Sequence, residues 1–145
     1  SSLQELAEGR FQNAIAEVDS IPPDNVRRVV MCSGKVYYDL LEARRKADNK
    51  EVAIIRIEQL YPFPEEELKV IMQDYQHVTD FVWCQEEPKN QGAWYNCQHR
   101  MKRVIPDKVY LNYVGRPASA APAVGYMSLH LQQQKALVEE ALTIE

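Results

Sequence analysis

The sequence predicts an α/β domain with a mostly parallel sheet of about five strands and helices on both faces. Short apolar runs alternate with amphipathic stretches of helical spacing four times along the chain. Such alternation is typical of parallel strands joined by right-handed helical crossovers. The length of 145 residues is that of one domain, and 46% of the residues are hydrophobic. A chain of this size buries enough surface to form a core without a metal or a disulfide.

Residues 1–25 lack this alternation. Their apolar residues are loosely spaced, Gly9 interrupts them, and the sequence Ile21-Pro22-Pro23-Asp24 would break a helix. We expect an arm that wraps over the surface or leads in from a preceding domain. The α/β domain itself is expected at residues 26–145.

The first strand is expected at Val29–Cys32, and the turn Ser33-Gly34-Lys35 separates it from a helix at Val36–Ala47, whose apolar residues recur at helical spacing. The β-branched residues of Val52–Ile57 favour a second strand. Pro64 precedes three glutamates, which predicts a helix start because acidic residues favour the positive end of the helix dipole. The same patterns predict a strand at 81–84, a helix at 94–104, a strand at 109–114, a small-residue loop at 115–125 and a helix at 128–142.

Charge and cysteine content exclude some classes of protein. A net charge of -4 argues against nucleic acid as a partner. No apolar run approaches the ~20 residues needed to span a bilayer, so no membrane partner is expected. Cys32 and Cys84 lie in strand patterns and no pair has C-x-x-C spacing. We interpret the cysteines as buried, reduced thiols in a reducing compartment, although Cys97 could be exposed.

The stretch from Trp83 to Trp94 contains the end of a buried strand, two adjacent carboxylates and an amide-rich turn. Ligands and partner domains of α/β proteins sit at the edge of the sheet where such strands end. Glu86 and Glu87 could act as an acid/base pair. However, neighbouring residues of an extended segment point to opposite sides, so pairing or capping at a domain contact is the favoured reading.

Two further loops are candidates for binding. Ser33-Gly34-Lys35 could cradle a phosphate between a strand and a helix, although a tight turn with a solvated lysine is the favoured interpretation. The segment 116–125 contains two prolines and several alanines, which suits either a rigid surface loop or a contact surface anchored by Arg116. The basic residues His99 to Arg103 are interpreted as a solvated helix face. No catalytic set, cofactor motif or metal-ligand spacing is found, so none of these sites is expected in the chain.

Four motifs occur in order: VVMCSGKVYY, VAIIRIEQLYPFP, WCQEEPKNQGAW and GRPASAAPAVG. Together they closely resemble the C-terminal domain of the E1 component of bacterial-type 2-oxoglutarate dehydrogenase. The resemblance covers nearly the whole chain and implies a transketolase-like C-terminal fold. It also implies a full enzyme that uses thiamine diphosphate and Mg²⁺, bound by preceding domains, to decarboxylate 2-oxoglutarate and to pass the succinyl group to the lipoyl arm of E2 in the tricarboxylic acid cycle.

By this resemblance the chain is a non-catalytic structural and interface domain of a cytoplasmic bacterial enzyme. Its expected partners are the preceding E1 domains, a second E1 subunit in a homodimer, and the E2 and E3 components. The candidate interface residues are Glu86, Glu87, Asn90, Trp94, Arg116 and Ser119. The alternative is a regulatory module that binds a nucleotide or an acyl-CoA, with Ser33, Gly34, Lys35 and Arg116 as phosphate contacts.

Overall fold

The computed structural model describes residues 13–60, 62–116 and 127–144, with the backbone alone at residues 127–130. Within these residues it confirms the predicted α/β class. The sheet has the order β1-β3-β2-β4-β5, in which β3, β2, β4 and β5 are parallel and β1 is antiparallel. The strands are β1 (Ala14–Ile15), β2 (Arg28–Cys32), β3 (Val52–Ile57), β4 (Asp80–Pro88) and β5 (Leu111–Arg116). The helices are α2 (Val36–Lys46), α3 (Glu65–Met72), α4 (Gly92–Met101) and α5 (Met127–Leu142), with 3-10 turns η1 (Pro23–Asn25) and η2 (Gln73–Tyr75).

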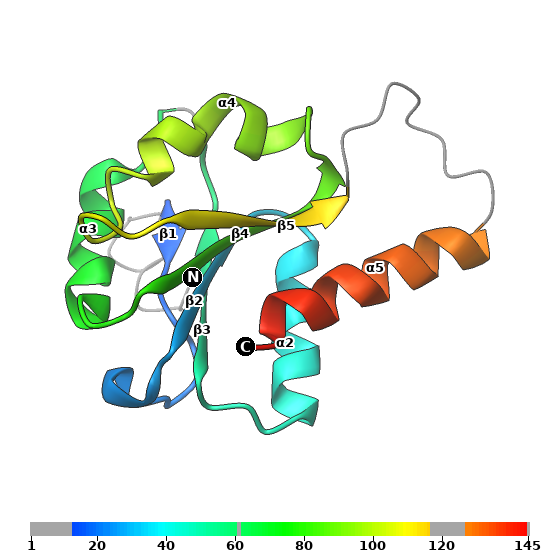
Figure 1. Cartoon of the computed structure of the whole chain (residues 1–145), viewed down its shortest axis with the longest axis horizontal. Coiled ribbons are helices and arrows are strands. Elements are labelled where there is room, and N and C mark those ends of the chain that lie inside the picture. The colour runs from blue at the N-terminus through cyan, green and yellow to red at the C-terminus, as the bar shows by residue number, and fades with distance from the viewer. Residues whose placement is uncertain (1–12, 61, 117–126, 145) are drawn as a thin grey trace, which may run out of the picture.

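Helices cover both faces of the sheet, with α3 and α4 on one face and α2 and α5 on the other (Figure 1). Successive residues of β2 enter different cores: Val29 and Met31 pack on the α3 and α4 side, and Val30 and Cys32 on the α2 and α5 side. All four are fully buried. Burial on both faces explains why the strands read as continuous apolar runs in the sequence.

Three elements differ from the expected bounds by two residues or more. β4 continues to Pro88, whereas the apolar run ends at 84, because β5 supplies a pairing partner as far as Pro88↔Arg116. β5 accordingly covers 111–116 and not 109–114, and α4 begins at Gly92 and not at Trp94. Glu86 and Glu87 therefore lie within the end of a strand.

The three cysteines lie in the interior of the domain. Cys32, Cys84 and Cys97 are all buried free thiols, and burial raises the pKa of Cys32 and of Cys84, the latter to about 12. The alternative of an exposed Cys97 is therefore wrong.

Within the described ranges, no helix has the length and apolar character needed to cross a bilayer.

The N-terminal arm contributes a strand that the sequence did not predict. β1 pairs with β3 through Ala14↔Ile57, and it is only two residues long, too short for a propensity pattern to reveal. The Glu67 carboxylate on α3 accepts hydrogen bonds from the backbone N–H groups of Asn13 (3.1 Å) and Ala14 (3.3 Å). The arm thus covers one edge of the sheet; the domain boundary at residue 25 stays a prediction.

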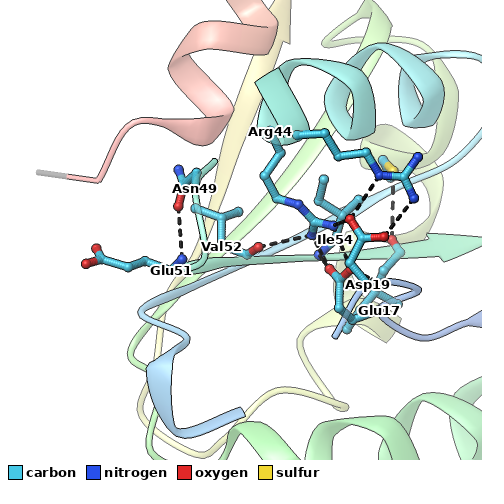
Figure 2. Close-up of polar contacts among 10 residues, drawn as sticks. Glu17, Asp19, Arg44, Asn49, Glu51, Val52 and Ile54 are labelled. Carbon is cyan, nitrogen blue, oxygen red and sulfur yellow. Dashed lines mark hydrogen bonds and ion pairs between the residues drawn. The ribbon is translucent and has the colours of Figure 1, made fainter. Parts of the chain in front are cut away.

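A buried ion cluster holds the arm against α2 and β3 (Figure 2). The Arg44 side chain is 1% exposed and donates to both carboxylate oxygens of Glu17, to Oδ2 of Asp19 at 2.7 Å and to the carbonyl of Val52 at 3.2 Å. Oε1 of Glu17 also accepts from the N–H of Ile54 at 2.9 Å. The buried cation is therefore fully paired, as a charge in a core must be.

Hydrogen bonds from arginines also set the charge state of Asp19. The bond from Arg45, with a further one from Arg44, lowers the pKa of the Asp19 carboxyl to about 2. The Asp19 carboxylate is therefore ionised throughout the physiological range.

Replacing Arg44 is expected to lower the free energy of unfolding strongly. Arg44→Ala leaves the buried Glu17 carboxylate without its counter-ion, which should cost about 3–5 kcal/mol in urea unfolding at pH 7. Arg45→Ala is the matched control, because Arg45 contacts Asp19 from an exposed position and should cost no more than about 1 kcal/mol. Equal costs for the two variants would contradict the assignment of Arg44 as the anchor of the arm.

Candidate functional site

The order of the strands creates a topological switch point at the carboxyl edge of the sheet. β2 and β4 are parallel neighbours, yet the chain leaves β2 for α2 on one face and leaves β4 for α4 on the other (Figure 1). Ligands and partners of open α/β sheets bind at this kind of switch point. Two segments singled out in the sequence, Ser33–Lys35 and Glu86–Asn90, flank the switch point.

Gln85 holds the end of β4 and the turn that follows it, on one side of the switch point. Its side chain is 1% exposed although the residue is polar. Oε1 accepts hydrogen bonds from the indole Nε1–H of Trp83 (2.8 Å) and from the backbone N–H of Trp94 (3.0 Å). Nε2 donates to the carbonyls of Glu87 (3.1 Å), Pro88 (2.9 Å) and Gln91 (2.8 Å). One carboxamide thus fixes the loop between β4 and α4, and its capacity for hydrogen bonds is fully used.

Gly92 closes this loop at a position that suits only glycine. Its φ is +69°, and a Cβ there would lie 3.2 Å from Oε1 of Gln85 and 3.3 Å from Oε1 of Glu87. Glycine adopts this backbone conformation without strain and leaves room for both side chains. The glycine therefore allows α4 to start directly against the Gln85 carboxamide.

Tyr113 ties β5 to the same loop. Its hydroxyl donates to the carbonyl of Arg116 at 2.6 Å, and its ring packs on Trp94 with centroids 5.3 Å apart. The Lys89 ammonium lies 5.4 Å from the centroid of the same ring. A Cβ at Gly115 would come within 2.6 Å of the Tyr113 hydroxyl, so this approach requires glycine.

Arg116 extends the site to α5 and α2. Its Nη2 donates to Oε1 of Gln134 at 3.1 Å, and Nε2 of Gln134 donates to Oδ2 of Asp39 at 2.9 Å. Nε of Arg116 is buried and has no hydrogen-bond acceptor among the described residues. The end of β5 therefore presents a cation that is only partly paired within the described part of the chain.

The other side of the switch point consists of the turn after β2 and of Arg56 on β3. Gly34 has φ +78° and no atom within 4 Å of a Cβ added there, and Lys35 is exposed. Arg56 pairs with Cys32 in the sheet register, and its guanidinium lies 5.2 Å and 5.0 Å from the ring centroids of Tyr37 and Tyr38. Nε of Arg56 likewise has no acceptor within residues 13–60, 62–116 and 127–144.

Five of the six predicted interface residues are described by the structure and lie at this edge. Glu86 is partly buried, Glu87 and Asn90 are exposed, and Trp94 is partly buried. Ser119 lies outside the described residues. Partial desolvation raises the pKa of Glu87, and the charge of Glu86 raises it further, while Arg116 opposes the shift.

Sequence reasoning missed Gln85, Tyr113 and Arg56, the residues that build the site. A glutamine directly after Phe81-Val82-Trp83-Cys84 was a usable signal, because a polar residue that continues a buried strand requires hydrogen-bond partners. Nothing in the sequence indicated the stacking of Arg56 on two tyrosines from a different element.

The arrangement suits binding of a polar partner. The carboxamide of Gln85 is saturated and Glu87 is exposed, while Arg56 and Arg116 each keep one buried Nε–H without an acceptor among the described residues. Nowhere in the described ranges do three His, Cys, Asp or Glu side chains come together as a metal would need.

Replacing Gln85 is expected to disorder the loop after β4. Gln85→Leu keeps a similar volume but leaves the N–H donors of Trp83 and Trp94 unpaired and removes one hydrogen bond from each of three carbonyls, which should cost about 3 kcal/mol or more. Urea unfolding measures the loss, and the fluorescence of Trp83 and Trp94 reports it locally. Gln73→Leu, at an exposed position on η2, should change stability by no more than about 0.5 kcal/mol. An equally small effect at Gln85 would contradict its organising role.

Comparisons with known proteins agree with this fold. A family model described as 2-oxoglutarate dehydrogenase C-terminal matches residues 1–142. The chain is 65% identical over 143 residues to the 2-oxoglutarate dehydrogenase E1 component of Haemophilus influenzae, covering 99% of this chain and 15% of that protein. It is 54% identical over 147 residues to the E1 component of Azotobacter vinelandii, covering 99% of this chain and 16% of that protein.

A solved structure supports the fold alone. A chain described as "Split gene transketolase, inactive beta4 tetramer" matches with a TM-score of 0.59 at 14% identity, covering 92% of this chain and 44% of that one. The chain thus has the α/β architecture of a transketolase-like domain and spans about 15% of the length of the curated relatives that it matches. On the family match and the identity of its relatives, it belongs to the 2-oxoglutarate dehydrogenase C-terminal family.

Proposed function

We propose that this chain is the C-terminal structural and interface domain of a 2-oxoglutarate dehydrogenase E1 component. The full enzyme decarboxylates 2-oxoglutarate in the tricarboxylic acid cycle and transfers the succinyl group to the lipoyl arm of E2. It acts in the bacterial cytoplasm as a homodimer, with E2 and E3 as further partners. The domain alone is inactive. The family match and the 15% share of its relatives' length support this proposal.

The oxygen atoms at the end of β4 and in the turn after it do not fit thiamine diphosphate with Mg²⁺. Such a site needs oxygen ligands that are free to reach a metal and its diphosphate. The Gln85 carboxamide oxygen already accepts two hydrogen bonds, and the Glu87, Pro88 and Gln91 carbonyls are engaged by its nitrogen. We therefore assign the cofactor to parts of the full enzyme outside this chain.

One observation carries the proposal: a loop at the sheet edge that is rigidly built and directs charged groups outward. Gln85 removes the internal freedom of the loop, so docking of a partner costs little ordering. Nε of Arg116 is buried without an acceptor among the described residues, and such a donor costs about 1–3 kcal/mol if it is left unpaired. Arg116 also forms no ion pair with a carboxylate of the described residues, and a carboxylate of a neighbouring domain would supply one. Glu87 offers a complementary acceptor on the same edge.

The interface is tested in the full-length E1 polypeptide with Arg116→Ala and Glu87→Ala. Each variant should weaken the dimer roughly 10-fold, the equivalent of one charge-assisted contact, and should lower both activity and melting temperature. Sedimentation, turnover and calorimetry measure these three properties.

Two control variants separate an interface role from a local one. Gln134→Ala removes an internal partner that Arg116 and Asp39 share, and Glu66→Ala removes an exposed carboxylate elsewhere. Both should leave the dimer intact. Unchanged dimerisation, activity and thermal stability in Arg116→Ala and Glu87→Ala would refute the interface assignment.

A second candidate function is regulation by a nucleotide or an acyl-CoA. The unpartnered Nε atoms of Arg56 and Arg116 within the described chain, together with the open turn at Gly34, favour it. Backbone N–H groups at the start of α2 and two arginine forks are suited to phosphate. Ser33 and Lys35 would complete the contacts.

Calorimetric titration with AMP and with acetyl-CoA distinguishes this candidate from a purely structural role. Binding should release heat and should weaken at least about 10-fold in Lys35→Ala, which loses a charge at the phosphate. The exposed Lys50→Ala should bind like the parent protein. The absence of heat at millimolar ligand, in the chain and in full-length E1 alike, would rule out the regulatory site.

A further inference from the structure

The segment from Lys89 to Pro106, which includes α4, differs in charge from the rest of the molecule. It contains no aspartate or glutamate, and it carries four lysines and arginines as well as His99, whereas the whole chain has a net charge of -4. This segment therefore has a net positive charge in an acidic protein.

The fold gathers this charge on the outer surface of α4. The helix buries Ala93, Cys97 and Met101 against the sheet. The exposed residues of α4 and of the turn after it, here called the α4 basic face, include Tyr95, His99, Arg100, Lys102 and Arg103. Tyr95 is 65% exposed. Figure 1 shows α4 at the top of the view, on the face of the sheet that α3 also covers.

Most of the cations on this face are not used by the fold. Arg103 lies 3.8 Å from Glu65, a carboxylate that it shares with Lys69 at 3.7 Å. His99, Arg100 and Lys102 make no ion pair within the described residues. A hollow of about 220 Å³ adjoins them, lined by Phe63, Glu65, His99, Arg100 and Arg103. Its lining therefore combines one aromatic ring with two arginines, a histidine and one carboxylate.

We propose that the α4 basic face is a docking surface for an acidic peptide segment of a partner protein. Arginine forks match carboxylates in geometry, and Tyr95 and Phe63 supply flat apolar contact between the charges. A short acidic segment can engage the cations while avoiding the acidic remainder of the chain. A nucleic acid would extend its phosphates across that remainder, where the net charge of the protein repels it.

The strength of such a contact follows from its exposure. Each solvent-exposed ion pair contributes little, and salt at physiological strength screens charges beyond about 8 Å. Binding should therefore be weak, rapid and strongly dependent on salt, as in electrostatically steered encounters.

The test uses full-length E1 and a fluorescein-labelled poly-glutamate peptide, with fluorescence anisotropy as the readout. The peptide should bind at low salt and be released as sodium chloride is added. Arg100→Gln combined with Lys102→Gln should weaken binding roughly 2- to 30-fold, the range expected for two exposed ion pairs. Neither residue has an ion pair to lose within the described chain, so folding is preserved. Tyr95→Ala should weaken binding as well.

A matched control removes the same charge elsewhere. Lys46→Gln combined with Lys50→Gln, on and after α2, should bind the peptide like the parent protein. Equal binding by the α4 variant and the parent would overturn the proposal. Tighter binding of a poly-adenylate oligonucleotide than of the peptide would overturn it too, because it would identify a nucleic-acid surface.

Discussion

The hydrogen bonds of one buried carboxamide, that of Gln85, determine how this domain presents its functional edge. β4 extends beyond the point where its side chains are apolar, so the backbone that follows needs polar partners away from water. The Gln85 carboxamide accepts hydrogen bonds from the indole N–H of Trp83 and the backbone N–H of Trp94. It donates to two carbonyls at the end of β4 and to one in the turn that follows. Glu87 and Arg116 consequently sit on a preformed surface. The interface function proposed for this edge depends on that rigidity, because a mobile loop would have to be ordered at each encounter.

A second buried polar group, the Arg44 guanidinium, fixes the N-terminal arm and not the sheet edge. It holds the arm through Glu17 and Asp19, so the segment that enters the domain has one position relative to the sheet. The remainder of the interior is two apolar cores separated by fully buried strands. Apolar packing of this kind fixes the fold but tolerates many details, whereas a satisfied polar network specifies one geometry. The two networks lie where the chain must be held in a defined way.

The sequence was sufficient for the α/β class and the order of its regular elements, because strands buried on both faces and amphipathic helices leave clear patterns. It was insufficient for β1, whose two residues pair only because Glu67 and β3 receive them. It also misplaced the end of β4, since pairing with β5 overrides the loss of hydrophobic character after Cys84. Helical spacing identified the inward face that carries Arg44, but the partners of Arg44 lie 25 and 27 residues away and no local pattern reveals them. The stretch Trp83–Trp94 located the candidate edge because its two adjacent carboxylates stand out in the sequence. The hydrogen bonds that hold this edge were missed because a single glutamine, Gln85, does not stand out.

The central claim is that the edge formed by the ends of β2, β4 and β5 is covered by another part of the E1 enzyme. Hydrogen–deuterium exchange of the 145-residue chain and of full-length E1 tests it directly. If the claim is right, the backbone amides of residues 86–91 and 33–36 exchange at least about 10-fold more slowly in the full-length enzyme, while the amides of central β2 are equally protected in both. Identical exchange at residues 86–91 in the two proteins would contradict the account.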